Sequence, residues 1–164
     1  MAIGMQLTQS HDFARFAPVI GEVDLGESFV QSLRHWCARS ERPSDLRLWE
    51  VFLALDVTTP VGVCGWYQTR EMPPHLAWLS WLGIRHSLRR CGAGGAMLTA
   101  LVQLARTTPG LTELWVYTDA VDPSIHRFYE RAGFRCAGTG GNVAPHAGLA
   151  AEDKVFCLQL AQLG

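Results

Sequence analysis

The chain has 164 residues, of which 48% are hydrophobic and 18% are charged, and its formal net charge is −1. This composition suits a globular chain with one hydrophobic core, and it excludes a disordered chain or one that binds nucleic acid through a large positive charge. No apolar run reaches the length of a membrane span and no secretory signal is recognisable, so we expect one cytoplasmic domain over residues 1–164 without nucleic-acid or membrane partners.

The first part of the chain predicts a strand followed by two helices. Weak alternation favours a strand over residues 1–8. Ser10 is a candidate N-cap for a helix over about residues 11–20, whose length Pro18 would limit. Apolar residues at helical spacing then predict a second helix after Gly26.

A hairpin is expected next. Pro43 marks the end of the second helix, and residues 46–55 read as a strand. A turn over residues 56–60 leads to a further strand over residues 61–67, which completes the hairpin.

Strands and helices alternate in the rest of the chain. The strand over residues 76–84 is apolar almost throughout, as expected when both of its faces are covered. This order of elements predicts an α/β domain with a central mixed, twisted sheet of six or seven strands, flanked by about four helices. The further expected elements are a helix over 93–106, a strand over 114–118, a helix over 123–132, a strand over 134–137, a loop over 139–151 and a strand over 154–160.

A glycine-rich turn links the strand over residues 76–84 to the helix that follows it. Such a turn presents unpaired backbone N–H groups and the positive end of a helix dipole, which together suit a diphosphate. The turn alone does not separate a phosphate cradle from a structural helix entry. Its Gly-x-Gly-Gly spacing matches neither a dinucleotide fingerprint nor a P-loop. The expected contacts are the amides of Ala93, Gly94, Gly95 and Ala96, the close approach allowed at Gly92 and Gly94, and the charges of Arg89 and Arg90.

A second motif covers residues 122–134, and it ends with Phe128-Tyr129-Glu130-Arg131-Ala132-Gly133-Phe134. With the turn Arg89-x-x-Gly92-x-Gly94, it resembles the GNAT superfamily of N-acetyltransferases. The motifs of that superfamily are Arg/Gln-x-x-Gly-x-Gly/Ala and, later, Asn-x-x-Ala-x-x-Phe/Leu-Tyr-Glu-Lys/Arg-x-Gly-Phe. The resemblance covers roughly residues 76–138 and implies a GNAT-like fold that binds acetyl-CoA.

The resemblance also implies a mechanism without a covalent enzyme intermediate. The strands over residues 76–84 and 114–118 would diverge, and the pantetheine arm would pair with the backbone of Leu82, Gly83 and Ile84. A backbone N–H of Gly83 or Ile84 would polarise the thioester carbonyl, and a neutral amine would attack it. Tyr129 corresponds to the family tyrosine that hydrogen-bonds or protonates the departing thiolate.

Two departures from the family pattern limit the prediction. Asp122 stands where the family often has asparagine, so it either contacts the cofactor or only caps the following helix. Many members also carry a glutamate base in the strand before the turn, whereas residues 78–82 contain no carboxylate. A water chain, or an amine of low pKa, would remove the need for a base. The side chains that could serve as the base are Glu71, His75, His86 and Asp119.

Aromatic residues gather in the three central strands, and one of their tryptophans is a candidate wall for an acceptor pocket that favours apolar or aromatic amines. Strand alternation places Trp78 and Ser80 on one face and Leu79 and Trp81 on the other. The first two helices and the loops over residues 69–75 and 139–151 are expected to supply the remaining acceptor contacts. The cluster consists of Trp49, Trp66, Tyr67, Trp78 and Trp81.

The sequence therefore predicts an acetyl-CoA-dependent N-acetyltransferase that acts on a primary amine of a small molecule, as a monomer or homodimer. A non-catalytic acyl-CoA-binding regulatory module is the first alternative, and an enzyme that acylates protein N-termini or uses another acyl donor is the second. The six histidines and five cysteines lack metal-ligand spacing, so no metal is expected. Cys91 lies in the glycine turn without a recognisable neighbouring base, which argues against a nucleophilic thiol.

Overall fold

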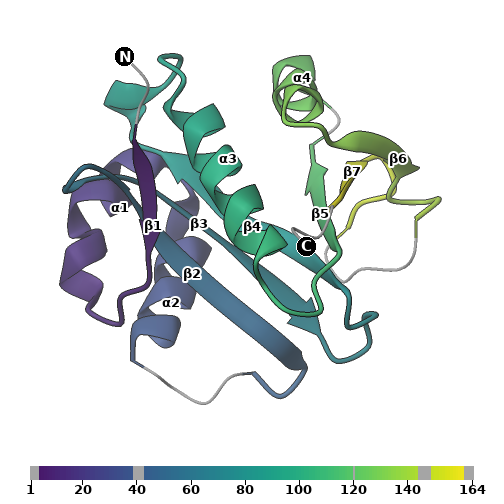
Figure 1. Ribbon diagram of the computed structural model, residues 1–164, viewed down its shortest axis with the longest axis horizontal. Helices are drawn as coiled ribbons and strands as arrows, with labels where there is room; N and C mark the ends of the chain where they lie inside the picture. The colour runs from purple at the N-terminus through teal and green to yellow at the C-terminus, as the bar shows by residue number, and fades with distance from the viewer. Residues whose placement is uncertain (1–3, 39–42, 120, 144–148, 161–164) are drawn as a thin grey trace.

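One mixed sheet of seven strands runs through the computed structural model, which describes residues 4–38, 43–119, 121–143 and 149–160 (Figure 1). The strand order is β1-β2-β3-β4-β5-β7-β6, and neighbours are antiparallel except for the parallel pair β4 and β5. The expected α/β fold with a mixed sheet of six or seven strands is confirmed. The strands are β1 (Met5–Thr8), β2 (Leu46–Asp56), β3 (Thr59–Thr69), β4 (Leu76–Ile84), β5 (Glu113–Thr118), β6 (Arg135–Thr139) and β7 (Lys154–Gln159).

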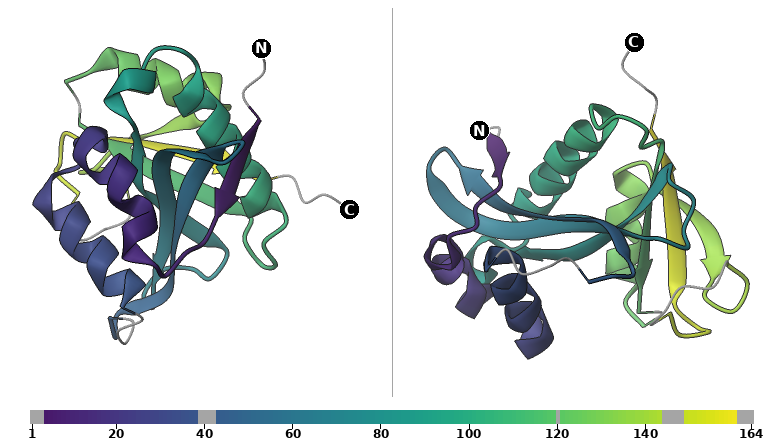
Figure 2. Two further views of the ribbon diagram at one scale, coloured as in Figure 1. Left: turned by 90° about the vertical axis from the view of Figure 1, so that its left-hand side faces the viewer. Right: turned by 90° about the horizontal axis from the view of Figure 1, so that it is seen from below.

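Helices cover both faces of the sheet. Helices α1 (Ala17–Val23) and α2 (Gly26–Cys37) lie against one face of β2 and β3, and α3 (Ala93–Arg106) lies against the other (Figure 2). α4 (Pro123–Arg131) joins the α3 side, because its Tyr129 belongs to the same buried cluster as the core residues of α3. None of the described helices is both long enough and apolar enough to cross a bilayer.

Two buried clusters hold these layers together. Burying an apolar side chain contributes roughly 1.5–3 kcal/mol, so clusters of this size fix how the helices sit on the sheet. The α1–α2 side includes Phe16, Phe29, Leu33, Val51 and Leu53. The α3 side includes Phe52, Met97, Leu98, Leu101 and Phe156.

The helix expected over residues 11–20 differs from the one in the structure. Asp12, not Ser10, is the N-cap, and it accepts the Ala14 N–H at 3.0 Å. This cap starts a 3₁₀ turn, η1 (Phe13–Phe16), which α1 then follows. Pro18 falls in the first turn of α1, where the missing N–H costs no hydrogen bond, instead of shortening the end of a longer helix.

Strand β4 contains a bulge at Trp81. Between the pairs Gly65–Ser80 and Val63–Gly83, β3 has one residue and β4 has two. Trp81 has a φ of 49°, a left-handed conformation that costs about 1–3 kcal/mol for a residue other than glycine. The extra residue breaks the alternation, and the Trp81 ring lies 5.4 Å from that of Phe29 on the α2 side. The prediction that Trp81 shares a face with Leu79 is therefore wrong.

The parallel pair β4 and β5 separates after three residue pairs. Leu76, Ala77 and Trp78 pair with residues 113–115 of β5, and the ladder ends there. β4 continues to Ile84 while pairing with β3, so the edge that faces β5 has no strand partner over residues 79–84. The divergence that the family resemblance implied is present, and it leaves backbone groups available to an extended ligand.

Candidate functional site

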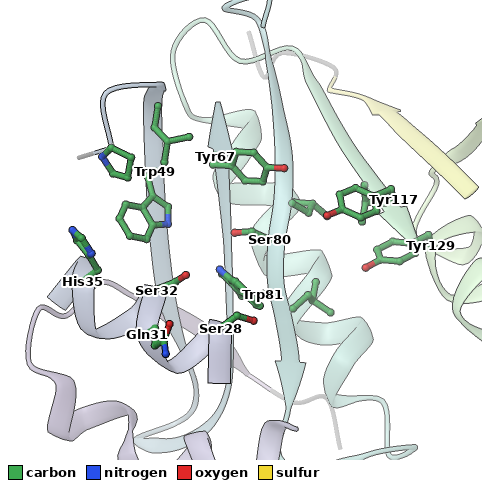
Figure 3. A pocket seen from close by; sticks show the side chains of 15 residues that line it. Ser28, Gln31, Ser32, His35, Trp49, Tyr67, Ser80, Trp81, Tyr117 and Tyr129 are labelled. Atoms are coloured by element: carbon green, nitrogen blue, oxygen red, sulfur yellow. The ribbon is translucent and has the colours of Figure 1, made fainter. Parts of the chain in front are cut away.

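A pocket of about 780 Å³ opens where β4 and β5 diverge, and it extends under α2 (Figure 3). Residues from α2, β2, β3, β4, β5 and α4 line it. The elements that meet here lie far apart in the sequence, and the twist of the sheet brings them to one place. This pocket is therefore the candidate functional site.

Tyr129 of α4 reaches one end of this pocket. Only 6% of the residue is exposed, and its ring packs against Phe134 and Phe156 at 5.5 and 6.1 Å between centroids. Burial raises the pKa of Tyr129 to about 12, so the hydroxyl keeps its proton throughout the physiological range. In the described part of the chain this hydroxyl has no hydrogen-bond partner. The Tyr129 hydroxyl can thus donate a hydrogen bond, and it points toward the gap between β4 and β5 (Figure 3).

Two further tyrosines line the same pocket, and neither was given a role in the site by the sequence patterns. Tyr67 comes from β3 and Tyr117 from β5, and their hydroxyl ends point toward the space between the strands (Figure 3). Burial, and to a smaller extent the neighbouring Tyr117, raise the pKa of Tyr67. The pocket accordingly contains three phenol groups.

Ser80 supplies an unusual polar group to the pocket wall. Its Oγ atom is fully buried and has no hydrogen-bond partner within the described residues. A buried hydroxyl without a partner is rare, because the group loses its hydrogen bonds to water and gains none in return. Ser80 lies in β4, within the stretch where many family members carry their glutamate, and its Oγ atom is buried in the pocket wall.

The exposed face of α2 forms the opposite wall. Ser28, Gln31, Ser32 and His35 lie at helical spacing on the side opposite the buried stripe that contains Phe29. Acceptor contacts were expected from the first two helices, but no residue of either helix was named. The sequence pattern that indicates these residues is the helical spacing of polar side chains along α2.

The tryptophans of the central strands divide into two groups. Trp49 and Trp81 line the pocket. Trp66 packs in the core at 5.2 Å from the Phe52 ring, and Trp78 packs at 5.7 Å from that of Trp115. Two of the central tryptophans thus line this pocket, and their role as the wall of an acceptor site stays a prediction.

The glycine turn has the backbone shape of an anion cradle. Arg90 and Gly92 both have positive φ, at 63° and 90°, and Gly92 is the N-cap of α3. No side chain caps this helix, so its first amides, those of residues 93–95, remain without an intrahelical acceptor. When backbone conformations alternate between left-handed and right-handed before a helix begins, successive N–H groups point toward one position, as they do in anion-binding sites.

Ala96 does not fit its predicted role. Its N–H donates to the Gly92 carbonyl at 3.0 Å and closes the first turn of α3. The fourth residue of a helix is the first whose amide can make this bond, so Ala96 is not an available donor.

The two arginines of the turn behave differently. The Arg89 guanidinium donates to the backbone carbonyls of Val23 at 3.0 Å and Ile84 at 3.4 Å, and so ties the end of α1 to the end of β4. Arg90 is exposed and makes no hydrogen bond or ion pair with the residues that the structure describes. Of the two, Arg90 is the one with its charge available to a ligand.

The three predicted β4 residues differ in where their side chains lie. Leu82 lines the pocket, and Ile84 is buried in the α3-side core. At Gly83, an added Cβ would come within 2.9 Å of Leu25 and 3.1 Å of Val23, so the missing side chain lets the end of α1 and the residues after it pack closely on β4. Gly83 and Ile84 can therefore meet a ligand only through their backbone.

Asp122 is the N-cap of α4. Its carboxylate accepts the Ser124 N–H at 2.8 Å, and this hydrogen bond lowers the pKa of Asp122. Helix capping thus accounts for an aspartate at position 122 without any contact to a ligand.

None of the four side chains considered as a base lines the pocket. His75 lies before β4, 4.0 Å from Glu113, and Asp119 accepts the Val121 N–H at 2.9 Å. Glu71 and His86 are exposed. Among the described residues, no group of three or more His, Cys, Asp or Glu side chains could hold a metal ion.

Comparisons with known proteins agree with this geometry. The model of the acetyltransferase (GNAT) family matches residues 15–134. No curated protein matches the chain. Similar solved structures include an acetyltransferase from Streptococcus agalactiae (14% identity, TM-score 0.67, covering 96% of this chain and 99% of that one). The ribosomal-protein-S18-alanine N-acetyltransferase from Escherichia coli is also similar (15% identity, TM-score 0.66, covering 98% of this chain and 95% of that one). So is a Bacillus subtilis acetyltransferase in complex with CoA (15% identity, TM-score 0.65, covering 96% of this chain and 98% of that one).

Proposed function

Because the chain belongs to the GNAT family of acetyltransferases, we propose that it transfers an acetyl group from acetyl-CoA to a primary amine of a small molecule, by direct attack of the amine. The observation that carries the proposal is the unpaired edge of β4, which faces β5 and opens into the pocket that Tyr129 lines. Bound acetyl-CoA would supply the acetyl group as an activated thioester.

The described residues fit this donor. The open amides of residues 93–95, with Arg90 beside them, would hold the diphosphate. The free edge of β4 from Leu79 to Ile84 would pair with the pantetheine amides as a neighbouring strand does. A backbone N–H near the bulge at Trp81 would polarise the thioester carbonyl, and bulges commonly occur next to active sites.

Tyr129 would act on the leaving sulfur as a hydrogen-bond donor. Full proton transfer is unfavourable, since a thiol pKa near 8.5 and a Tyr129 pKa of about 12 differ by roughly 3.5 units, or about 5 kcal/mol. A hydrogen bond to a charged acceptor needs no transfer and contributes about 1.5–3 kcal/mol. Burial therefore favours Tyr129 as a stabiliser of the thiolate over Tyr129 as an acid.

The amine must lose a proton, and the described pocket wall contains no carboxylate to take it. The pocket is large enough to hold ordered water. We therefore favour a water chain over a dedicated base.

A direct assay tests the proposal. Acetyl-CoA should bind in a calorimetric titration, and free thiol should then appear in proportion to acetylated product when small primary amines are added. Binding without thiol release on any amine would favour the non-catalytic acyl-CoA module. Faster reaction with peptide N-termini would support a protein N-terminal acyltransferase, and faster reaction with longer acyl-CoAs would support a different acyl donor.

Substitutions of the two arginines should have different effects: the change at Arg90 should weaken acetyl-CoA binding, and the change at Arg89 should lower stability. Arg90→Ala should raise the acetyl-CoA Kd about 2- to 5-fold at low salt, because an exposed charge on a diphosphate contributes about 0.3–1 kcal/mol and is screened by salt. Arg89→Ala should lower the free energy of unfolding by about 1 kcal/mol through the lost hydrogen bonds, with a smaller effect on Kd. Calorimetry and urea unfolding measure the two effects. A larger loss of affinity in Arg89→Ala would reverse the assignment.

A further inference from the structure

The pocket has two chemically different ends. Tyr129 and Leu82 lie at the end where β4 and β5 diverge, which is the donor side under the proposed function. The other end lies between α2 and β2, with Trp49 and His35 on its walls (Figure 3). Ser80 and Trp81 lie between these two ends (Figure 3). An acceptor molecule would therefore occupy the α2 end and present its amine near Ser80.

Aromatic rings dominate the described walls of this end. Trp49 and Trp81 supply two indoles, and Tyr67 adds a phenol. Neighbouring rings hold the indoles in place: His35 lies 6.4 Å from Trp49, and Phe29 lies 5.4 Å from Trp81, between centroids. Flat walls fixed in this way suit a flat, apolar body, because aromatic pairs prefer offset or edge-to-face contact at such separations.

The described lining residues include no Asp, Glu, Lys or Arg. A second ammonium group on the substrate would lose its water without gaining a carboxylate partner, and a carboxylate would find no Lys or Arg. Besides the His35 imidazole, the polar groups that α2 offers are uncharged: the Ser28 and Ser32 hydroxyls and the Gln31 amide. These groups can pair with a neutral polar substituent on the far side of a ring.

From these features we propose that the acceptor is an arylalkylamine, meaning a primary amine on a short chain attached to an aromatic ring, with no other charged group. This inference rests on the proposed acetyl transfer. The ring lies against Trp49 and Trp81, the chain passes Ser80, and the amine nitrogen reaches the thioester. The neutral amine nitrogen forms the new bond to the acetyl carbon and loses one proton to water. The carbon–sulfur bond breaks, and coenzyme A leaves as a thiolate that keeps the electron pair of that bond.

Four matched amines test the inference on the unmodified protein: 2-phenylethylamine, n-hexylamine, 1,6-diaminohexane and phenylalanine. We expect kcat/KM for 2-phenylethylamine to exceed that for n-hexylamine by about 10-fold, because hexylamine loses the ring contact. It should exceed the values for 1,6-diaminohexane and phenylalanine, each of which has a second charged group, by more than about 100-fold, because that charge finds no partner. A preference for the diamine or for phenylalanine would overturn the inference and leave acetyl transfer intact. Failure of all amines, or of acetyl-CoA binding, would overturn both.

Substitutions of Trp49 and of Trp115 provide the second test. Trp49→Leu should lower kcat/KM for 2-phenylethylamine about 10-fold, while the value for n-hexylamine stays within about 3-fold and Trp49→Phe retains most activity on both. Trp115→Leu is the matched control, because Trp115 is a half-buried tryptophan on β5 that does not line the pocket. Calorimetric binding of 2-phenylethylamine to the CoA-loaded protein should weaken in Trp49→Leu alone. Equal losses on both amines would show that Trp49 supports the fold and does not recognise a ring.

Discussion

Gly94→Leu is expected to abolish acetyl-CoA binding, with a loss of affinity of at least about 100-fold, while the protein stays folded. A Cβ at Gly94 would lie 3.5 Å from the Phe128 ring and 3.9 Å from Ile84, which is ordinary contact. The rest of a leucine side chain extends beyond this contact, and under the proposed function it would compete with the diphosphate for the space at the start of α3. Calorimetric titration with acetyl-CoA measures the loss, and thermal unfolding checks the fold.

Two matched variants make this result specific. Gly94→Ala adds only the tolerated Cβ and should keep affinity within a few-fold, with a stability gain of up to about 1 kcal/mol from helix propensity. Gly21→Leu places the same leucine at an exposed helical glycine of α1 with open space around it, and should leave binding unchanged. Retained affinity in Gly94→Leu would show that the start of α3 is not the cradle.

Tyr129→Phe is expected to lower kcat by about 10- to 100-fold with little change in acetyl-CoA affinity. The magnitude is that of one hydrogen bond to a charged acceptor, about 1.5–3 kcal/mol. The hydroxyl has no partner within the described residues, so its removal should leave the aromatic packing against Phe134 and Phe156 in place. Thiol release at saturating acetyl-CoA and amine provides the measurement.

The pH dependence identifies the role of the hydroxyl. Tyr129 has its pKa raised by burial to about 12, so the proton stays on the oxygen up to about pH 11, and the ratio of wild-type to Phe rates should be constant from pH 7 to 10. A ratio that falls toward 1 near pH 10 would indicate an exposed phenol with an ordinary pKa. Equal rates of the two proteins at all pH values would make Tyr129 a packing residue only.

Much of the fold followed from local patterns. The order of strands and helices, the apolar strand β4 and the glycine turn before α3 were all recognisable in short stretches of sequence, because each depends on neighbours along the chain. The error at the first helix was local too: Asp12 and Ser10 are both good caps, and the 3₁₀ turn that follows Asp12 lets α1 begin at Ala17, so that Pro18 falls in the first turn of α1. Residues 144–148, within the expected loop over 139–151, lie outside the described residues.

The site was predictable only where a motif is contiguous. The position of Tyr129, the glycine turn and the divergence of β4 from β5 were expected from the family resemblance. The roles of individual residues within the turn were not recoverable in the same way. Arg89 anchors backbone carbonyls and the Ala96 amide closes a helical turn, and both facts depend on where α1 and Gly92 lie in space.

The sequence by itself determined the α/β architecture and the family, because two short motifs carry the glycine turn and the tyrosine helix within a few residues each. Tertiary structure alone decided the part of the pocket that lies next to α2. Its walls come from α2, β2, β3 and β4, and the bulge that turns Trp81 toward α2 arises from the register of β4 on β3. Register is a relation between strands, so no single stretch of the chain can encode it.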